Sequence, residues 1–163
     1  MEDDGAPQDS LLPYDVWMEE SLRYVVMRAL TFAASYELPG KHHYYITFRT
    51  DFPGVTMPQR LREKYPQEMT IVLQHQFRDL HVDVPGRVFG VTLSFGGVAS
   101  PLTVPLDAVS AFVDPSIQYG LRFKVEMPEM TPAPEPAPVP PPVPAGEAGP
   151  QVVSLDAFRK RRD

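Results

Sequence analysis

The distribution of proline constrains this fold more than any other feature of the sequence. Of the 20 prolines in 163 residues, eight lie between Pro132 and Pro144. Each proline fixes φ and removes a backbone donor, so this density is incompatible with a helix interior or a central strand. The foldable part therefore ends near Pro128. Residues 129–150 are predicted to form an extended, partly polyproline II linker with no packed core of its own.

The segment after the linker, residues 151–163, breaks the proline-rich pattern. Large apolar residues return and a basic run follows them: Val152, Val153, Leu155 and Phe158, then Arg159, Lys160, Arg161 and Arg162. So short a segment does not fold alone. We therefore predict a peptide that becomes ordered when it docks on another protein. A nucleic-acid patch is the weaker interpretation of the basic run, because the protein as a whole is acidic.

Charge and composition narrow the function classes. The formal net charge is −6, which argues against general nucleic-acid binding, because neutralising phosphates needs a basic surface. The chain has no cysteine, which excludes disulfides, thiolate catalysis and Cys-based zinc sites. The acidic start, residues 1–12, is predicted to be disordered and lacks the features of a signal peptide. No apolar run is long enough to cross a membrane, so we expect a cytoplasmic protein.

Residues 14–36 show the periodicity of a helix. Apolar residues three and four positions apart form one stripe: Met18, Leu22, Val25, Ala29, Phe32 and Tyr36. Val26, Leu30 and Ala33 form a second stripe beside it. This apolar surface is wider than one packing face requires. Either the helix is buried within its own domain, or it packs on its own sheet with one face and on a partner subunit with the other.

Residues 43–125 contain about six short segments with strand character, separated by Pro and Gly turns. The predicted strands are 43–49, 69–76, 77–84 with Leu80, Val82 and Val84 facing inward, 87–95 with a candidate bulge at Gly90, 98–104 and 119–125. A short helix is expected after Pro58, and residues 105–113 are expected to form a short helix or an edge strand. The pattern predicts a mainly β fold: a small antiparallel barrel or sandwich with an N-terminal helix.

A search of the sequence for catalytic chemistry finds little. His75 and His81 lie on neighbouring predicted strands with Asp79 and Asp83, so a metal-dependent hydrolase is conceivable, but no recognisable ligand spacing supports it. Solvent-exposed polar residues are the simpler interpretation. Neither a G-x-S-x-G nucleophile elbow nor a phosphate-binding P-loop is present. We therefore expect a binding protein without a cofactor or a catalytic residue.

Three segments carry a resemblance to a known family: Phe52–Pro58 (FPGVTMP), Ile71–Gln74 (IVLQ), and Leu93–Val98 (LSFGGV), which continues to Val104-Pro105-Leu106. With the tail at 152–160, they resemble the alphaproteobacterial branch of the stringent starvation protein B (SspB) family, bacterial adaptors that deliver ssrA-tagged proteins to the ClpXP protease. The resemblance implies a substrate-binding and dimerisation domain over residues 13–128, linker 129–150 and a ClpX-docking peptide at 151–163. It also implies an Sm-like β fold, for which RNA binding is the alternative function.

The resemblance further implies three sets of site residues. The peptide-binding groove is expected to use Val55, Met57, Val72, Leu73, Gln74, Val91, Thr92, Leu93 and Phe95. The dimer interface is expected along the stripe of Met18, Leu22, Val25, Ala29, Phe32 and Tyr36. Docking on the N-terminal domain of ClpX is expected to use Val152, Val153, Leu155, Phe158, Arg159 and Lys160. A tag peptide, ClpX and a second copy of the chain are thus the expected partners, with neither nucleic acid nor membrane among them.

Overall fold

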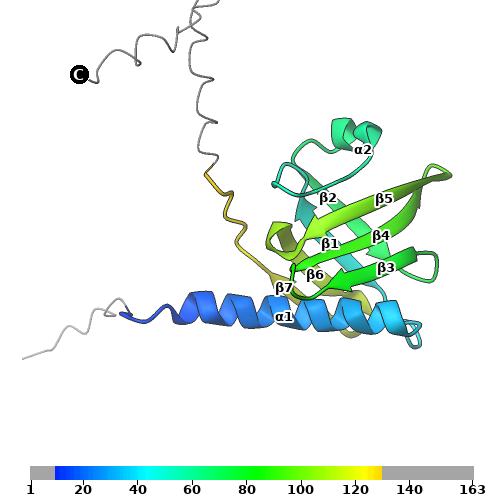
Figure 1. Cartoon of the computed structure of the whole chain (residues 1–163). Helices are drawn as coiled ribbons and strands as arrows, with labels where there is room; N and C mark the ends of the chain where they lie inside the picture. The colour runs from blue at the N-terminus through cyan, green and yellow to red at the C-terminus, as the bar shows by residue number, and fades with distance from the viewer. Residues whose placement is uncertain (1–9, 130–163) are drawn as a thin grey trace, which may run out of the picture. The chain divides into compact units, whose positions relative to one another are not determined.

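The structure, a computed structural model, describes residues 10–129, and the predicted linker beyond Glu129 and the predicted docking peptide lie outside this range. Residues 10–128 belong to one compact unit. Its helices are α1 (Tyr14–Ser35), α2 (Gln59–Lys64) and two 3-10 turns, η1 (Leu106–Ala108) and η2 (Pro115–Ile117). The prediction of a mainly β fold with an N-terminal helix is confirmed (Figure 1).

The strands form two antiparallel sheets. The first has the order β2-β1-β6-β7 and consists of β1 (Tyr44–Arg49), β2 (Glu68–Leu73), β6 (Val109–Asp114) and β7 (Tyr119–Arg122). The second has the order β3-β4-β5 and consists of β3 (Arg78–Asp83), β4 (Val88–Phe95) and β5 (Val98–Pro105). The sheets do not close into a barrel, so β2, β7, β3 and β5 remain edge strands.

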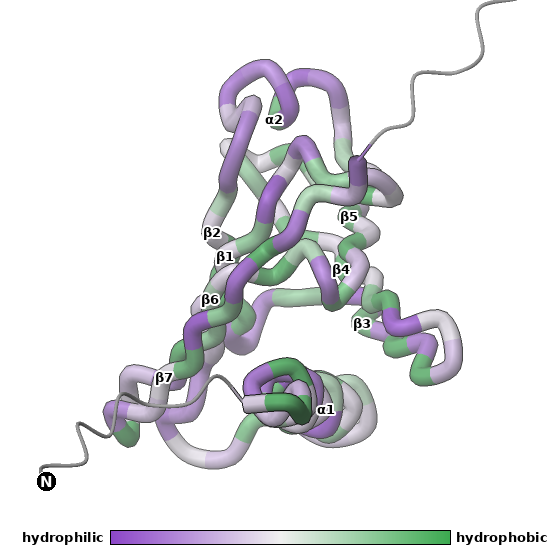
Figure 2. Tube along the Cα trace, turned by 90° about the vertical axis from the view of Figure 1, so that its left-hand side faces the viewer, coloured by the Kyte–Doolittle hydropathy of each residue, from purple (hydrophilic) through white to green (hydrophobic). Residues whose placement is uncertain are grey.

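The core lies between the two sheets and α1. In β1, Tyr44, Ile46 and Phe48 are buried, while the residues between them face outward, which confirms the predicted alternation. The largest fully buried side chains come from both sheets and include Phe48, Phe89 and Phe112. Figure 2 views α1 end-on and shows it as a separate layer beside the sheets. The helix therefore covers one open side of the β structure.

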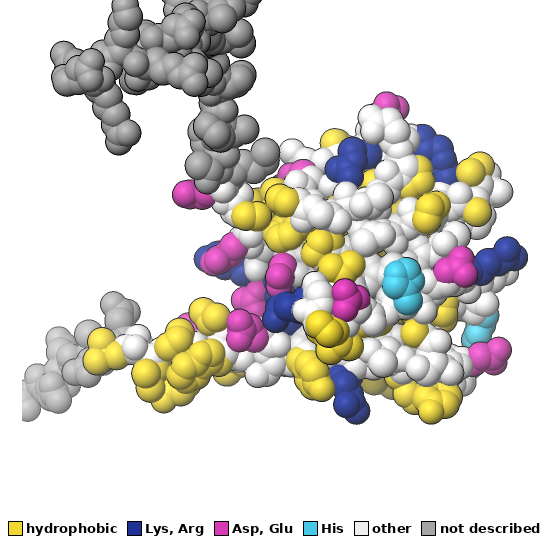
Figure 3. Space-filling model, in the orientation of Figure 1, with side chains coloured by type: hydrophobic (Ala, Val, Ile, Leu, Met, Phe, Trp, Pro, Cys, Tyr) yellow, Lys and Arg dark blue, Asp and Glu magenta, His cyan; other side chains and the backbone are white. Residues whose placement is uncertain are grey.

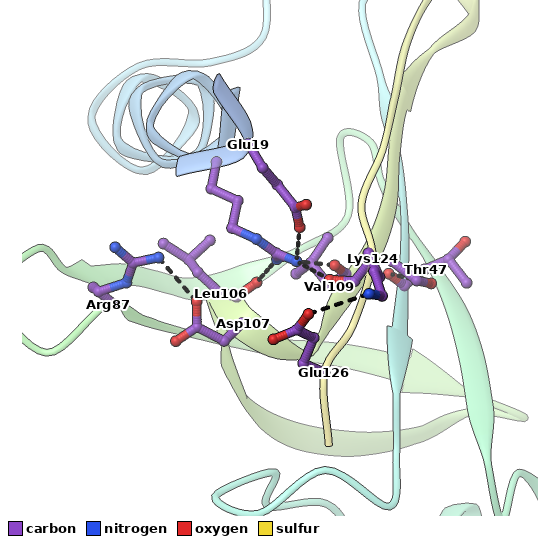
Figure 4. Close-up of polar contacts among 10 residues, drawn as sticks. Glu19, Thr47, Arg87, Leu106, Asp107, Val109, Lys124 and Glu126 are labelled. Carbon is purple, nitrogen blue, oxygen red and sulfur yellow. Dashed lines mark hydrogen bonds and ion pairs between the residues drawn. The ribbon is translucent and has the colours of Figure 1, made fainter. Parts of the chain in front are cut away.

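Arg23 fixes the orientation of α1 on this body. The residue is only 6% exposed, and its guanidinium lies 4.5 Å from the centre of the Phe123 ring. It donates hydrogen bonds to three main-chain carbonyls and one carboxylate: those of Leu106, Val109 (3.0 Å), Lys124 (3.1 Å) and Glu19 (3.0 Å). Figure 4 shows these groups converging beneath the helix. Since a buried arginine needs all these acceptors, the helix cannot rotate without breaking the network.

Two predictions for residues 77–95 differ from the structure. Gly90 is not a bulge: β4 pairs with β5 in continuous register, and the irregularity lies on β3 between Arg78 and His81. The His81 ring on the neighbouring strand β3 lies directly over Gly90, in the space that a Cβ atom would occupy. Val84 is exposed rather than inward-facing, because β3 ends at Asp83.

Residues 105–113 form neither of the two predicted elements alone. They begin with the 3-10 turn η1 and continue into β6, which lies inside its sheet between β1 and β7. The partner strands of β6 come from distant parts of the chain, and the local sequence carries no signal for that. Within residues 10–129, no helix combines the length and the apolar character needed to cross a bilayer.

A polar cluster ties the start of β1 to the end of β6. The His42 ring lies 2.5 Å from a carboxylate oxygen of Asp114, whose side chain is only 6% exposed. Ser116 donates from its backbone N–H and its hydroxyl to the other oxygen of Asp114. Burial alone would raise the pKa of Asp114, but the hydrogen bonds from Ser116 and His42 outweigh it and hold this pKa below its ordinary value.

Asp114 should therefore make stability depend on pH under acidic conditions. Its pKa is lower in the folded than in the unfolded chain, so its contribution is present above the unfolded pKa and is lost as the pH falls below about 4. We expect the free energy of unfolding of Asp114→Asn to be lower than that of wild type at pH 7. The gap between the two free energies should be smaller at pH 3. Urea unfolding at both pH values measures these free energies. Asp107→Asn, at an exposed carboxylate, is the control. An equal difference at both pH values would contradict the assignment.

Candidate functional site

Two adjoining pockets form a groove between the end of β2 and the second half of β4. The first, of about 510 Å³, is lined by Thr70, Ile71, Val72, Gln74, His75, Gln76, Leu93, Ser94 and Phe95. The second, of about 520 Å³, is lined by His75, Gln76, Phe77, Arg78, Thr92, Leu93, Ser94, Gly97 and Ala99. His75, Gln76, Leu93 and Ser94 line both pockets, so the two are continuous. We call this surface the β2–β4 groove.

One wall of the β2–β4 groove is the edge strand β2. Its side chains alternate, so Ile71 is buried while Thr70 and Val72 are exposed. Because β2 has no neighbour beyond β1 among residues 10–129, half of its backbone N–H and C=O groups lack a strand partner in this range. This edge can therefore pair with an extended segment of another chain.

The other wall is β4 with the turn that follows it. Leu93 is 7% exposed and lines both pockets, so it supplies an apolar surface in the middle of the groove. Gly96 and Gly97 have φ angles of 59° and 80°, a conformation that glycine adopts without strain. These two residues return the chain tightly into β5, where Phe95 is opposite Val98. The turn borders the groove through Gly97, which lines the second pocket.

The predicted groove residues separate into two groups. Val72, Gln74, Leu93 and Phe95 line the first pocket, and Thr92 and Leu93 line the second. The remaining four, Val55, Met57, Leu73 and Val91, are buried in the core and line neither pocket. Contact of any of these residues with a peptide stays a prediction.

The other residues that line this groove were not predicted as site residues: Thr70, Ile71, His75, Gln76, Phe77, Arg78, Ser94, Gly97 and Ala99. Residues 74–77 connect β2 to β3, so they link the two sheets. In the sequence, this connection appears only as a polar segment that follows an apolar strand. That pattern does not show that the connection faces β4. That juxtaposition depends on how the two sheets pack.

The charge of the groove differs from that of the whole protein. The chain carries a net charge of −6, yet no carboxylate from the described part of the chain lines either pocket, and Arg78 contributes a cation. The remaining polar lining consists of amide, hydroxyl and imidazole groups. These groups can donate hydrogen bonds to a peptide backbone or to acidic side chains.

The histidines and aspartates of the metal-enzyme alternative do not form a cluster. In residues 10–129, no three His, Asp or Glu side chains are grouped so that they could hold a metal ion. The His81 ring is hydrogen-bonded to the main-chain carbonyl of Asp79 at 2.8 Å and covers Gly90, while His75 lines the β2–β4 groove. The described structure thus provides no support for a site made from these residues.

A second candidate surface lies on α1. The stripe of Val26, Leu30 and Ala33 is buried against the sheets. In the other stripe, Leu22 and Ala29 are half-buried, and Met18, Val25, Phe32 and Tyr36 are 62%, 40%, 46% and 65% exposed. Apolar side chains also gather on the first turns of α1, as Figure 3 shows, including Trp17 at 48% exposed. We call this surface the outer face of α1.

The predicted docking residues Val152, Val153, Leu155, Phe158, Arg159 and Lys160 lie outside the described residues. Comparison with protein families covers more of the chain. A family model described as stringent starvation protein B matches residues 16–152. The match spans nearly all of α1, both sheets and the β2–β4 groove. A search of curated proteins found no matching relative.

Proposed function

The chain belongs to the stringent starvation protein B (SspB) family, and from this premise we propose that it is an adaptor that binds ssrA-type degradation tags and tethers the tagged proteins to the ClpXP protease. The observation that carries the proposal is the β2–β4 groove, where an apolar lining runs beside an open strand edge. The strand edge can bind an extended peptide through its backbone, and the apolar lining can bind the side chains of that peptide. An adaptor needs both properties to hold an unfolded tag.

An extended peptide fits the physical character of this groove. Strand β2 has six residues, so its edge runs for about 20 Å at roughly 3.3 Å per residue. A peptide that adds to such an edge gains main-chain hydrogen bonds, while pockets beside it accept alternate side chains. Val72 and Leu93 provide the apolar contacts, and Gln74 provides an amide that can bond to the peptide.

The outer face of α1 supports a homodimer. Monomeric soluble proteins rarely leave a large contiguous apolar surface in water, and Met18, Phe32 and Tyr36 extend this one along most of the helix. A symmetric dimer would cover the same face of both copies. It would also place two tag-binding grooves in one adaptor.

A peptide titration tests the tag-binding step. A fluorescent ssrA peptide should bind the full-length protein with saturable anisotropy, and Leu93→Gln should weaken binding at least about tenfold. The reason is that the glutamine amide replaces part of the apolar wall of the groove. Burial of one large apolar side chain contributes about 1.5–3 kcal/mol to the free energy of binding. Val72→Gln repeats the test at an exposed position, where folding is not at risk.

Ile117→Gln is the matched control, because Ile117 is 59% exposed on η2 and lines neither pocket of the groove. Its peptide affinity should equal that of wild type. Absence of saturable binding by the wild-type protein would refute tag recognition. Unchanged affinity in both Leu93→Gln and Val72→Gln would show that the tag binds elsewhere.

A further inference from the structure

The β2–β4 groove extends further than its two pockets. A third pocket, of about 320 Å³, is lined by Ala33, Ala34, Ser35, Tyr36, Glu37, Leu38, Gln74, His75 and Phe77. It shares Gln74 and His75 with the first pocket of the groove and His75 and Phe77 with the second, so His75 lines all three. The extended surface therefore runs from the C-terminal end of α1, past the β2–β3 connection, to Arg78.

The α1 end of this surface is electronegative. The last turn of a helix presents carbonyls without intrahelical partners and carries a partial negative charge. Here the carbonyls of Ala33, Ala34 and Ser35 accept no backbone hydrogen bond from described residues outside the helix, and the last turn has no basic residue. Glu37 adds a full negative charge to the same pocket. This end suits a positively charged or hydrogen-bond-donating group.

The pocket lined by Gly97 and Ala99 is electropositive. Of the three pockets, Arg78 lines only this one, and no carboxylate among the described residues lines it. Among residues 10–129, neither Arg78 nor Glu37 takes part in an ion pair. Both charges are therefore free to act on a ligand. Arg78 offers a planar fork of donors, which matches a carboxylate.

We propose that this surface reads the order of charges along the bound peptide. A basic side chain lies at the α1 end beside Glu37, a carboxylate side chain lies at Arg78, and apolar residues between them contact Leu93. Glu37 and Arg78 are thus specificity-determining residues that set the direction in which the peptide binds. The proposal rests on the proposed tag-binding function and adds to it the charge pattern of the peptides that this adaptor accepts.

Two peptides of identical composition test the proposal. Each contains the same tag core, with Lys at one end and Asp at the other, and only the order of the two charged residues differs. Exposed ion pairs contribute about 0.2–1 kcal/mol each, or up to fivefold in affinity. We therefore expect wild type to prefer one order by about threefold to tenfold at low salt, with the preference shrinking at 0.5 M salt because the charges are screened.

Variants distinguish recognition of charge from a structural effect. Arg78→Gln and Glu37→Gln should each reduce the preference, and the double swap Arg78→Glu with Glu37→Lys should invert it, which mere destabilisation cannot do. Arg122→Gln, on β7 of the other sheet, is the control and should keep the wild-type preference. Equal wild-type affinity for both orders, or an unchanged preference in the double swap, would overturn the proposal.

The outcome also separates this inference from the function on which it rests. If both peptides bind equally and Leu93→Gln weakens both, the groove binds tags without reading charge order. If neither peptide nor the tag itself binds wild type, the tag-binding function fails as well.

Discussion

Removal of residues 151–163 is expected to abolish the stimulation of ClpXP by this adaptor while leaving the affinity for a tag peptide unchanged. The two activities are assigned to different parts of the chain: the groove lies within residues 70–99, and the docking peptide follows the linker. Truncation does not remove any residue that lines the groove. The expected result is a protein that still captures its substrate but no longer delivers it.

The size of the effect follows from the tether. Residues 129–150 span at most roughly 70 Å if fully extended at about 3.1 Å per residue. In the proposed function, a tether of that length would hold the bound substrate at an effective concentration of millimolar order near the protease, and such linkage raises avidity by about 10² to 10⁴. Degradation of a tagged fluorescent protein well below its KM should therefore fall from the stimulated rate to the rate without adaptor.

A matched pair of full-length variants refines this test. The first variant has serine in place of four apolar residues: Val152, Val153, Leu155 and Phe158. It keeps the length of the tail and its basic run, and we expect it to behave like the truncated protein. The second variant has serine in place of four prolines of the linker. It changes neither the groove nor the proposed docking peptide, so it should retain most of the stimulation of ClpXP. Full stimulation by the truncated protein would show that tethering through this tail is wrong.

Replacement of Phe32 by Glu is expected to convert the proposed dimer into a folded monomer. Phe32 is 46% exposed and belongs to the stripe on the outer face of α1, so its loss leaves the core of the subunit intact. In a symmetric interface the substitution occurs twice. Burial of two unpaired carboxylates should cost about 3 kcal/mol or more, which is at least roughly a hundredfold in the dissociation constant.

Sedimentation equilibrium of wild type and Phe32→Glu measures this difference directly. Ile117→Glu introduces the same charge at a similarly exposed apolar residue that belongs to η2 and not to α1, and it should remain dimeric. Peptide titration of the monomer should still show binding, because Phe32 does not line the β2–β4 groove. A monomeric wild type, or a dimer that tolerates Phe32→Glu, would remove the outer face of α1 as the interface.

Local patterns predicted most elements of this fold. The apolar periodicity of residues 14–36 and the alternation around Ile46 depend on neighbouring residues along the chain, and α1 and β1 begin and end within a residue or two of the predicted positions. Pro and Gly turns located the breaks between strands. The prediction was wrong where pairing decides the element: β6 is a central strand because β1 and β7 lie on either side of it.

The groove was only partly predictable for the same reason. The family resemblance pointed to β2 and β4, and Val72, Gln74, Leu93 and Phe95 do line one pocket. Whether a residue of these strands faces the groove or the core depends on how the two sheets pack. The residues of the β2–β3 connection, His75 among them, became candidates only when the structure brought that connection beside β4.

The sequence by itself determined the family and most of the element types, and it predicted a linker after residue 128, because motifs, periodicity and proline content are properties of consecutive residues. It left open which stripe of α1 is buried. The tertiary structure decided that question through Arg23, whose hydrogen bonds reach carbonyls more than 80 residues away and fix the rotation of the helix. Contacts between residues so distant in sequence, and the surfaces that they leave exposed, exist only once the chain has folded.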